Sequence, residues 1–279
     1  MTDAPSRSRV SSTGLAAGPE AQHGIGPAAL ELGKLGKLDA RVDRRTLALA
    51  RYVDRRALPA PPPGLDLAAA VEDWPMYAND RIGDCTTAAA GHMIEAWSAA
   101  ASGHAVEVSE RAVLEAFDAV KMVDPVTGEE GAVELDVLKL WRGRGIGGHA
   151  IGAFAAIDLA DHGLARAAAY LFGGLYIGIQ LPLRAQAQRV WDWTGSLEGP
   201  DAPGSWGGHA VDIVGYDESG LTAVTWGMLQ KLTWSFWDHY CDEAYCIISA
   251  DFLADGVSPA GLDLGALERD LALVTGRAS

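Results

Sequence analysis

The sequence changes its hydrophobic periodicity near the middle, and this change limits the folds that the chain can adopt. In the first half, apolar residues recur every three or four positions, the spacing of buried α-helices. Helices are expected at 85–101, 109–122, 135–142 and 153–162. In the second half, short runs rich in Val, Ile and aromatic residues predict strands at 175–181, 210–216, 221–226 and 244–249. Helices followed by strands, rather than alternating with them, indicate the α+β class.

Composition and prolines divide the chain into three parts. Residues 1–27 mix Ser, Gly, Pro and Ala without periodicity and predict a disordered tail. Residues 28–57 form a basic N-terminal arm, with a short helical stripe of apolar residues at 47–53. Three consecutive prolines, 61–63, then favour a connector, so the main domain is taken as 58–279. The basic arm is either a removable pro-segment lying on an acidic domain or an integral part of the fold.

The chain is strongly acidic, since 22 Lys and Arg residues stand against 37 Asp and Glu residues, a net charge of −15. A surface of this charge repels nucleic-acid phosphates and anionic lipids, so we expect neither nucleic acid nor membrane as a partner. The chain has only three cysteines, an odd number, and no apolar run that reads as a signal peptide or a membrane span. These features predict a cytoplasmic protein.

Cys85 is the first candidate catalytic residue. It falls in the first turn of the expected helix 85–101, where free N–H groups and the helix dipole lower a thiol pKa and favour a nucleophilic thiolate. The alternative is that Cys85 is a small core residue of an Ala-rich helix. No motif suggests a cofactor, and the spacing of the His and Cys residues does not indicate a metal site.

A partner for the thiol would decide between these interpretations, and His209 is the best candidate. It follows two glycines and stands where an apolar strand begins, a position from which the imidazole can face a cleft. His92 is seven residues along the same helix as Cys85, about 10 Å of rise, and is too far away for a hydrogen bond to the thiol. Cys241 and Cys246 are interpreted as buried thiols.

These motifs together resemble those of the papain-like cysteine peptidases. The segment Gly83-Asp84-Cys85 opens a helix, Gly208-His209-Ala210-Val211 follows more than a hundred residues later, and Thr225-Trp226-Gly227 comes next, in the order of that family. The similarity covers roughly 58–249 and is that of a divergent bacterial or phage-type member. It implies a two-lobed α+β fold, with a helical N-terminal lobe, an antiparallel β-sheet C-terminal lobe and a cleft between them.

The resemblance also implies roles for individual residues. Asn79 stands six residues before Cys85, where the family has the Gln of its oxyanion hole, and Thr225 stands near the position of the Asn that orients the catalytic His. Ile82 and Thr86 replace a disulfide Cys and a Trp of the family. The segment 228–242 is an insertion, either a helix buried against the sheet or a lid over the cleft.

Three functions follow from this resemblance. The first is cysteine-dependent acyl transfer that hydrolyses a peptide or amide bond through a thioester on Cys85, as in a thiol protease. The second is an acyltransferase or amide-forming enzyme that passes the acyl group to an amine, which the departures at Asn79, Thr86 and Thr225 favour. The third is a catalytically silent binding protein of the same fold. The expected partner is a peptide, amide or acyl substrate, with no cofactor and no metal.

Overall fold

A computed structural model describes residues 33–51, 60–125 and 127–252 of the chain. Within these residues there are five α-helices: α2 (Cys85–Ser102), α3 (Glu110–Val120), α4 (Glu134–Arg144), α5 (His162–Phe172) and α6 (Trp234–Tyr240). The longer strands are β5 (Ile151–Ala156), β6 (Leu175–Leu181), β8 (Gly207–Tyr216), β9 (Gly220–Thr225), β10 (Met228–Thr233) and β11 (Cys241–Ser249). The two-residue strands are β1 (Leu47–Ala48), β2 (Leu65–Asp66), β3 (Met122–Val123), β4 (Glu130–Gly131) and β7 (Val190–Trp191).

One large sheet organises the molecule. Its strands follow the order β1-β5-β11-β6-β8-β9-β10-β7, with β2 paired to β8, while β3 and β4 form a separate hairpin. The predicted α+β class is therefore confirmed. The sheet is mixed rather than purely antiparallel, because β1 pairs with β5 and β7 pairs with β10 in parallel at its two ends. Both parallel partners are two-residue strands that reach the sheet from distant parts of the chain.

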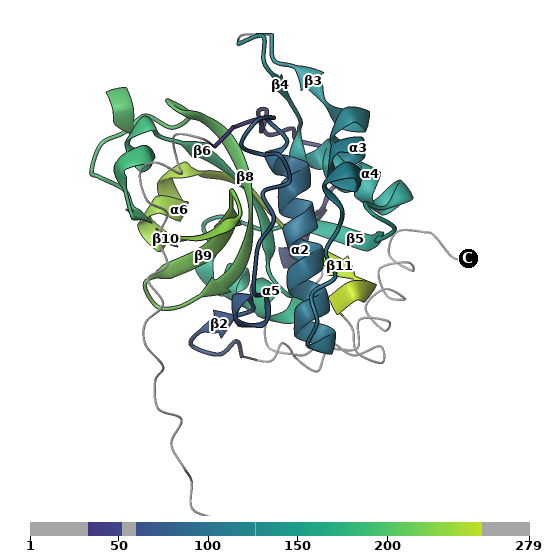
Figure 1. Cartoon of the computed structure of the whole chain (residues 1–279). Helices are drawn as coiled ribbons and strands as arrows, with labels where there is room; N and C mark the ends of the chain where they lie inside the picture. The colour runs from purple at the N-terminus through teal and green to yellow at the C-terminus, as the bar shows by residue number, and fades with distance from the viewer. Residues whose placement is uncertain (1–32, 52–59, 126, 253–279) are drawn as a thin grey trace, which may run out of the picture.

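Helix α2 runs through the centre of the view in Figure 1, between the strands β8 and β9 and the helices α3 and α4. Its many alanines allow close packing on all sides, so that it is buried almost throughout. Trp97 on α2 stacks on Trp141 of α4 with ring centroids 5.5 Å apart, and its Nε1–H donates to the carbonyl of Gly173 at 2.8 Å. The helix ends at Gly103, which adopts the left-handed conformation that favours glycine.

The helix expected at 153–162 is wrong. Its first part is the strand β5, hydrogen-bonded between β1 and β11, and the helix α5 begins only at His162. Asp161 sets this start, because its side chain accepts a hydrogen bond from the N–H of Leu164 and caps the helix. The Ala-rich run fits either periodicity, and pairing with two neighbouring strands decides for the strand.

The segment 228–242 forms the strand β10 and the helix α6. The aromatic residues Phe236, Trp237 and Tyr240 of α6 are buried in the core, and Phe236 stacks on Trp191 with centroids 5.6 Å apart. The helix thus packs against the sheet, as the first interpretation of this insertion expected, and does not form a lid. The strand β10, which pairs with β9 along its whole length, was not predicted.

The described part of the N-terminal arm, 33–51, lies within the fold. Instead of the helical stripe expected at 47–53, residues Leu47–Ala48 form β1 and Leu49–Arg51 form a 3-10 turn. The predicted tail, 1–27, lies outside the described residues, as does the stretch 52–59 next to the expected domain boundary. Among the helices that the structure describes, none is long and apolar enough to cross a bilayer.

Candidate active site

Cys85 lies at the first position of α2, fully enclosed. The N–H groups of Ala210 and Gly36 lie close enough to its Sγ atom to favour the thiolate, so β8 and the N-terminal arm meet at the thiol. The arm comes this close because Gly36 lacks a side chain: a Cβ there would lie 1.7 Å from the carbonyl oxygen of Gly83. Cys241 and Cys246 are also free thiols, with Cys246 buried and Cys241 partly exposed.

His209 lies on β8, next to the residue whose N–H reaches the thiol. Its Nε2 atom is 2.6 Å from the hydroxyl oxygen of Thr225 on the adjacent strand β9. The ring stacks on Trp226 with centroids 4.5 Å apart and an interplanar angle of 20°, which fixes its plane. When Nε2–H donates to Thr225, the other nitrogen, Nδ1, keeps its lone pair, and no protein group described in the structure hydrogen-bonds to it.

Burial keeps both reactive groups neutral in this state. It raises the pKa of Cys85 to about 12, although the N–H groups of Ala210 and Gly36 act in the opposite direction. Burial also lowers the pKa of His209 to about 3. The helix N-terminus was expected to lower the thiol pKa, and here the loss of solvent outweighs it. At neutral pH the site therefore holds a thiol and an uncharged imidazole.

Asn79 binds the arm through Lys34. The side-chain amide of Asn79 donates to the backbone carbonyls of Lys34 at 3.2 Å and Ile82 at 3.1 Å. The backbone carbonyl of Asn79 accepts from the N–H of Lys34 at 2.8 Å. The indole N–H of Trp226 also donates to the Lys34 carbonyl, at 3.2 Å. A peptide carbonyl thus occupies the place where Asn79 was expected to stabilise an oxyanion.

The turns that carry Asn79 and Thr225 have unusual backbones. Tyr77, Ala78 and Trp226 adopt positive φ angles of 54°, 67° and 47°, and no other non-glycine residue in the described ranges does so. Such conformations cost on the order of 1 kcal/mol or more each and are found where the surrounding structure holds a functional group in place. Tyr77 and Ala78 directly precede Asn79, and Trp226 directly follows Thr225, so the unusual backbone lies next to two candidate site residues.

The arm passes the thiol as a segment with one isolated β-bridge, at Lys37, and its backbone is bound on both sides. On one side, Lys37 N–H donates to the carbonyl of Gly208 at 3.1 Å. On the other side, the N–H of Ala132 donates to Gly36 at 2.8 Å and the N–H of Leu38 donates to Ala132 at 3.0 Å, which is a parallel bridge. Residues 33–38 are therefore bound as an extended peptide.

The side chain of Lys37, the residue after Gly36, is fully buried. Its ammonium nitrogen Nζ lies 2.8 Å from Asp242 Oδ2 and 3.0 Å from Glu243 Oε1. Glu134, at the start of α4, is a third acid close enough to interact with it electrostatically. We call Glu134, Asp242 and Glu243 the acidic site. Their charges, with the ion-pair hydrogen bond to Asp242, hold the pKa of Lys37 above its ordinary value despite burial.

Solved structures share this fold, whereas no protein-family model and no curated protein matches the chain. Xylellain, a cysteine protease from Xylella fastidiosa, superposes with a TM-score of 0.57 at 15% identity, covering 78% of this chain and 97% of xylellain. The proform of the ragweed pollen allergen Amb a 11, a cysteine protease, gives a TM-score of 0.53 at 18% identity, covering 74% and 71%. Procathepsin L 3 from the larval midgut of Tenebrio molitor gives a TM-score of 0.51 at 14% identity, covering 80% and 77%. The chain has the papain-like cysteine protease fold.

Sequence reasoning missed the residues that the arm contributes. Gly36 reaches the thiol from about fifty residues away, and Lys37 reaches the acidic site, which gathers side chains from α4 and β11. Trp226 was noted only as part of a motif, yet it stacks on the imidazole and binds the arm. A signal was present: the tripeptide Gly-Lys-Leu occurs twice in succession at 33–38, in an otherwise acidic chain.

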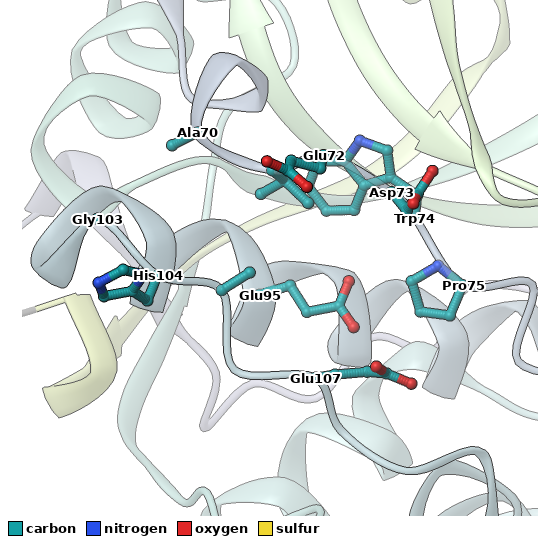
Figure 2. A pocket seen from close by; sticks show the side chains of 11 residues that line it. Ala70, Glu72, Asp73, Trp74, Pro75, Glu95, Gly103, His104 and Glu107 are labelled. Atoms are coloured by element: carbon teal, nitrogen blue, oxygen red, sulfur yellow. The ribbon is translucent and has the colours of Figure 1, made fainter.

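Figure 2 shows a second acidic pocket, lined by Glu72, Asp73, Trp74, Glu95 and Glu107 among others. Neither Cys85 nor His209 lines this pocket, which is separate from the candidate active site. Within it, the hydroxyl of Tyr77 donates to Glu95. Burial, and to a lesser extent the charge of Glu107, raises the pKa of Glu95 to about 8.

Replacing Glu95 by Gln should change how stability depends on pH. Because the pKa of Glu95 is raised by folding, its protonated form stabilises the protein fully below about pH 4.5, and this contribution is lost as pH rises through about 8. Glu95→Gln remains neutral and keeps an acceptor for Tyr77. Between pH 5 and pH 8 the melting temperature of the wild type should therefore fall by a few degrees more than that of the variant. Equal falls in the two proteins would contradict this ionisation.

Proposed function

We propose that this protein hydrolyses a peptide or amide bond through a thioester on Cys85. One observation carries the proposal: the thiol already faces an extended peptide, residues 33–38, whose backbone is hydrogen-bonded to Ala132, Gly208 and Asn79. A site that binds peptide backbone on both sides of a nucleophile favours a peptide substrate over other acyl compounds. The papain-like fold is consistent with this chemistry.

In the proposed reaction, His209 Nδ1 takes the proton of the Cys85 thiol as Sγ forms a bond to the substrate carbonyl carbon. The amide of Asn79 and the N–H of Cys85 stabilise the oxyanion. The carbon–nitrogen bond then breaks, and the imidazolium returns its proton to the departing amine. Water, deprotonated by His209, attacks the thioester and releases the acid and the free thiol.

The arm occupies this site without being positioned for attack. An N–H group, that of Gly36, points at Sγ, whereas a substrate must place a carbonyl carbon there. Reversing the direction of an extended chain exchanges the positions of its N–H and C=O groups, so substrates are inferred to run opposite to the arm. We infer that the arm is an inhibitory segment filling the cleft of a two-lobed molecule where α2 meets β8. The similar structures of Amb a 11 and of the Tenebrio molitor cathepsin are both of proforms.

The test needs the site opened in the intact chain. In Lys37→Glu, a carboxylate replaces the ammonium beside the acidic site, so the arm should leave. This protein is incubated with a peptide library, and the products are identified by mass spectrometry with Lys37→Glu/Cys85→Ala as control. Cleavage that disappears in the control supports the proposal, and identical products in both would contradict it. Adding a primary amine shows whether the acyl group passes to an amine instead of water, and the absence of any reaction favours a silent binding protein.

Thr225 is proposed to act by positioning His209. In the Lys37→Glu background, Thr225→Val keeps the shape of the side chain and removes the hydroxyl bonded to Nε2. The imidazole then rotates out of the productive orientation part of the time, so kcat should fall about 10- to 100-fold with little change in KM. Thr225→Ser, which restores the hydroxyl, should recover most of the loss. An equal loss in the Ser and Val variants would contradict the positioning role.

A further inference from the structure

The space around the Lys37 side chain fits a straight chain ending in an ammonium group. Gly178 on β6 forms one wall, and a Cβ there would lie 2.0 Å from Lys37 Cε, so only glycine leaves room for the stem. At the far end, Nζ donates hydrogen bonds to Asp242 at 2.8 Å and to the carbonyl of Leu38 at 3.3 Å. It also forms an ion pair with Glu243 at 3.0 Å, so oxygen atoms surround the ammonium.

The acidic site gathers three carboxyl groups around the single ammonium of Lys37. Glu134 is fully buried, and both of its carboxylate oxygens lack a hydrogen-bond partner among the described residues. Glu243 is held in place by the hydroxyl of Tyr245 at 2.8 Å, and Asp242 accepts from the amide of Gln180 at 2.8 Å. Three carboxyl groups gathered around one ammonium favour an occupant with a positive charge.

We propose that the acidic site selects a lysine side chain of the substrate, which takes the place of Lys37. This inference rests on the proposed function. Along the arm, the residue at the thiol precedes the residue in the acidic site. A substrate that runs in the opposite direction places its lysine in the acidic site first and the residue at the thiol after it. The bond that Cys85 attacks therefore lies on the C-terminal side of the selected lysine, within about two residues. The substrate class is thus a lysine-containing peptide.

The side chains at this site disfavour other occupants. An aliphatic side chain would leave the buried Glu243 and Glu134 and the partly exposed Asp242 without a cation, which is unfavourable. A glutamate would add a fourth carboxylate. The planar guanidinium of arginine is wider than an ammonium and meets the wall at Gly178, so arginine should bind less well than lysine.

Peptide binding tests this selection without relying on catalysis. The full-length Lys37→Glu/Cys85→Ala protein is titrated with fluorescent hexapeptides that differ at one position, where they carry Lys, Arg, Leu or Glu, and anisotropy is followed. The lysine peptide should bind at least about 10-fold more tightly than the leucine peptide. Lys37→Met/Cys85→Ala keeps an aliphatic stem and removes the charge. It serves as a second protein from whose site the arm is released, in case the first does not fold.

Changing the acidic site should alter this selection and little else. Glu243→Gln, introduced into the same protein, should reduce the preference for lysine over leucine by about 10-fold. Equal affinities for the lysine and leucine peptides, or no binding of any peptide, would overturn the inference. The binding variants lack the nucleophile, so their affinity for lysine peptides does not depend on catalysis. If they bind lysine peptides selectively but Cys85 of Lys37→Glu does not react, the proposed function is refuted and the lysine selection stands.

Discussion

Replacing Lys37 by Glu should increase the rate at which Cys85 reacts with iodoacetamide by about 100-fold or more. An uncompensated buried charge costs about 3–5 kcal/mol, and each 1.4 kcal/mol corresponds to a factor of ten in an equilibrium. The introduced carboxylate would stand beside Asp242 and Glu243, where the wild-type ammonium makes contacts of 2.8 and 3.0 Å. The arm should therefore leave, water should reach the thiol, and the pKa of Cys85 should fall from about 12 towards its ordinary value.

A charge reversal elsewhere in the arm provides the matched control. Among the described residues Arg45 pairs only with the nearby Asp43, and its side chain is 86% exposed, so Arg45→Glu removes an ion pair of little energetic value. Its alkylation rate should equal that of the wild type. Circular dichroism establishes that both variants are folded. A folded Lys37→Glu protein whose thiol reacts no faster than the wild type would show that the arm does not protect the site.

Removing either half of the proposed catalytic pair should reduce peptide hydrolysis by about 10⁴-fold or more in the opened protein. The two residues act on the same proton, so Cys85→Ala, His209→Ala and the double variant should lose activity to a similar extent rather than additively. Steady-state rates with one peptide, compared among the three variants in the Lys37→Glu background, measure this. The Nδ1 nitrogen of His209, which has no hydrogen-bond partner among the described residues, is the atom expected to carry the proton.

Labelling at pH 6 separates the role of the imidazole from a structural effect. An imidazolium next to the thiol lowers the thiol pKa, so Cys85 of the Lys37→Glu protein should be labelled rapidly at pH 6, and slowly in Lys37→Glu/His209→Ala. Labelling at pH 9, where even an ordinary thiol is largely ionised, should differ much less between the two proteins. Equal rates at both pH values would mean that His209 does not activate the thiol.

Elements with local signals could be predicted from the sequence. The strand β6, 175–181, lies between Gly173-Gly174 and Pro182, and its predicted bounds match those of the structure. Helix α2 was predicted from its apolar spacing. The strand β5 was not, because Ile151–Ala156 is Ala-rich and fits either structure, and only its neighbours β1 and β11 make it a strand. Tertiary pairing overrides local propensity in such segments.

The candidate site could be predicted only in part, for a similar reason. Cys85, His209, Asn79 and Thr225 stand in recognisable motifs, and the structure brings Thr225 to His209 and the strand after His209 to the thiol. The arm that fills the site is held by Lys37, whose ion-pair partner Asp242 lies 205 residues later in the sequence. No spacing rule links such positions, so the burial that neutralises the thiol and the imidazole could not be foreseen from the motifs.

The proposed hydrolysis requires an acyl group bound to Cys85, and trapping this group tests the proposal most directly. The opened protein, Lys37→Glu, is mixed with an activated ester of a lysine-containing peptide, quenched in acid within milliseconds to seconds, and analysed by intact mass and peptide mapping. A mass increase equal to the acyl group, located on Cys85 and absent in the Cys85→Ala control, is the predicted result. Hydrolysis that proceeds unchanged in Cys85→Ala, or a folded opened protein that forms no adduct, would contradict it.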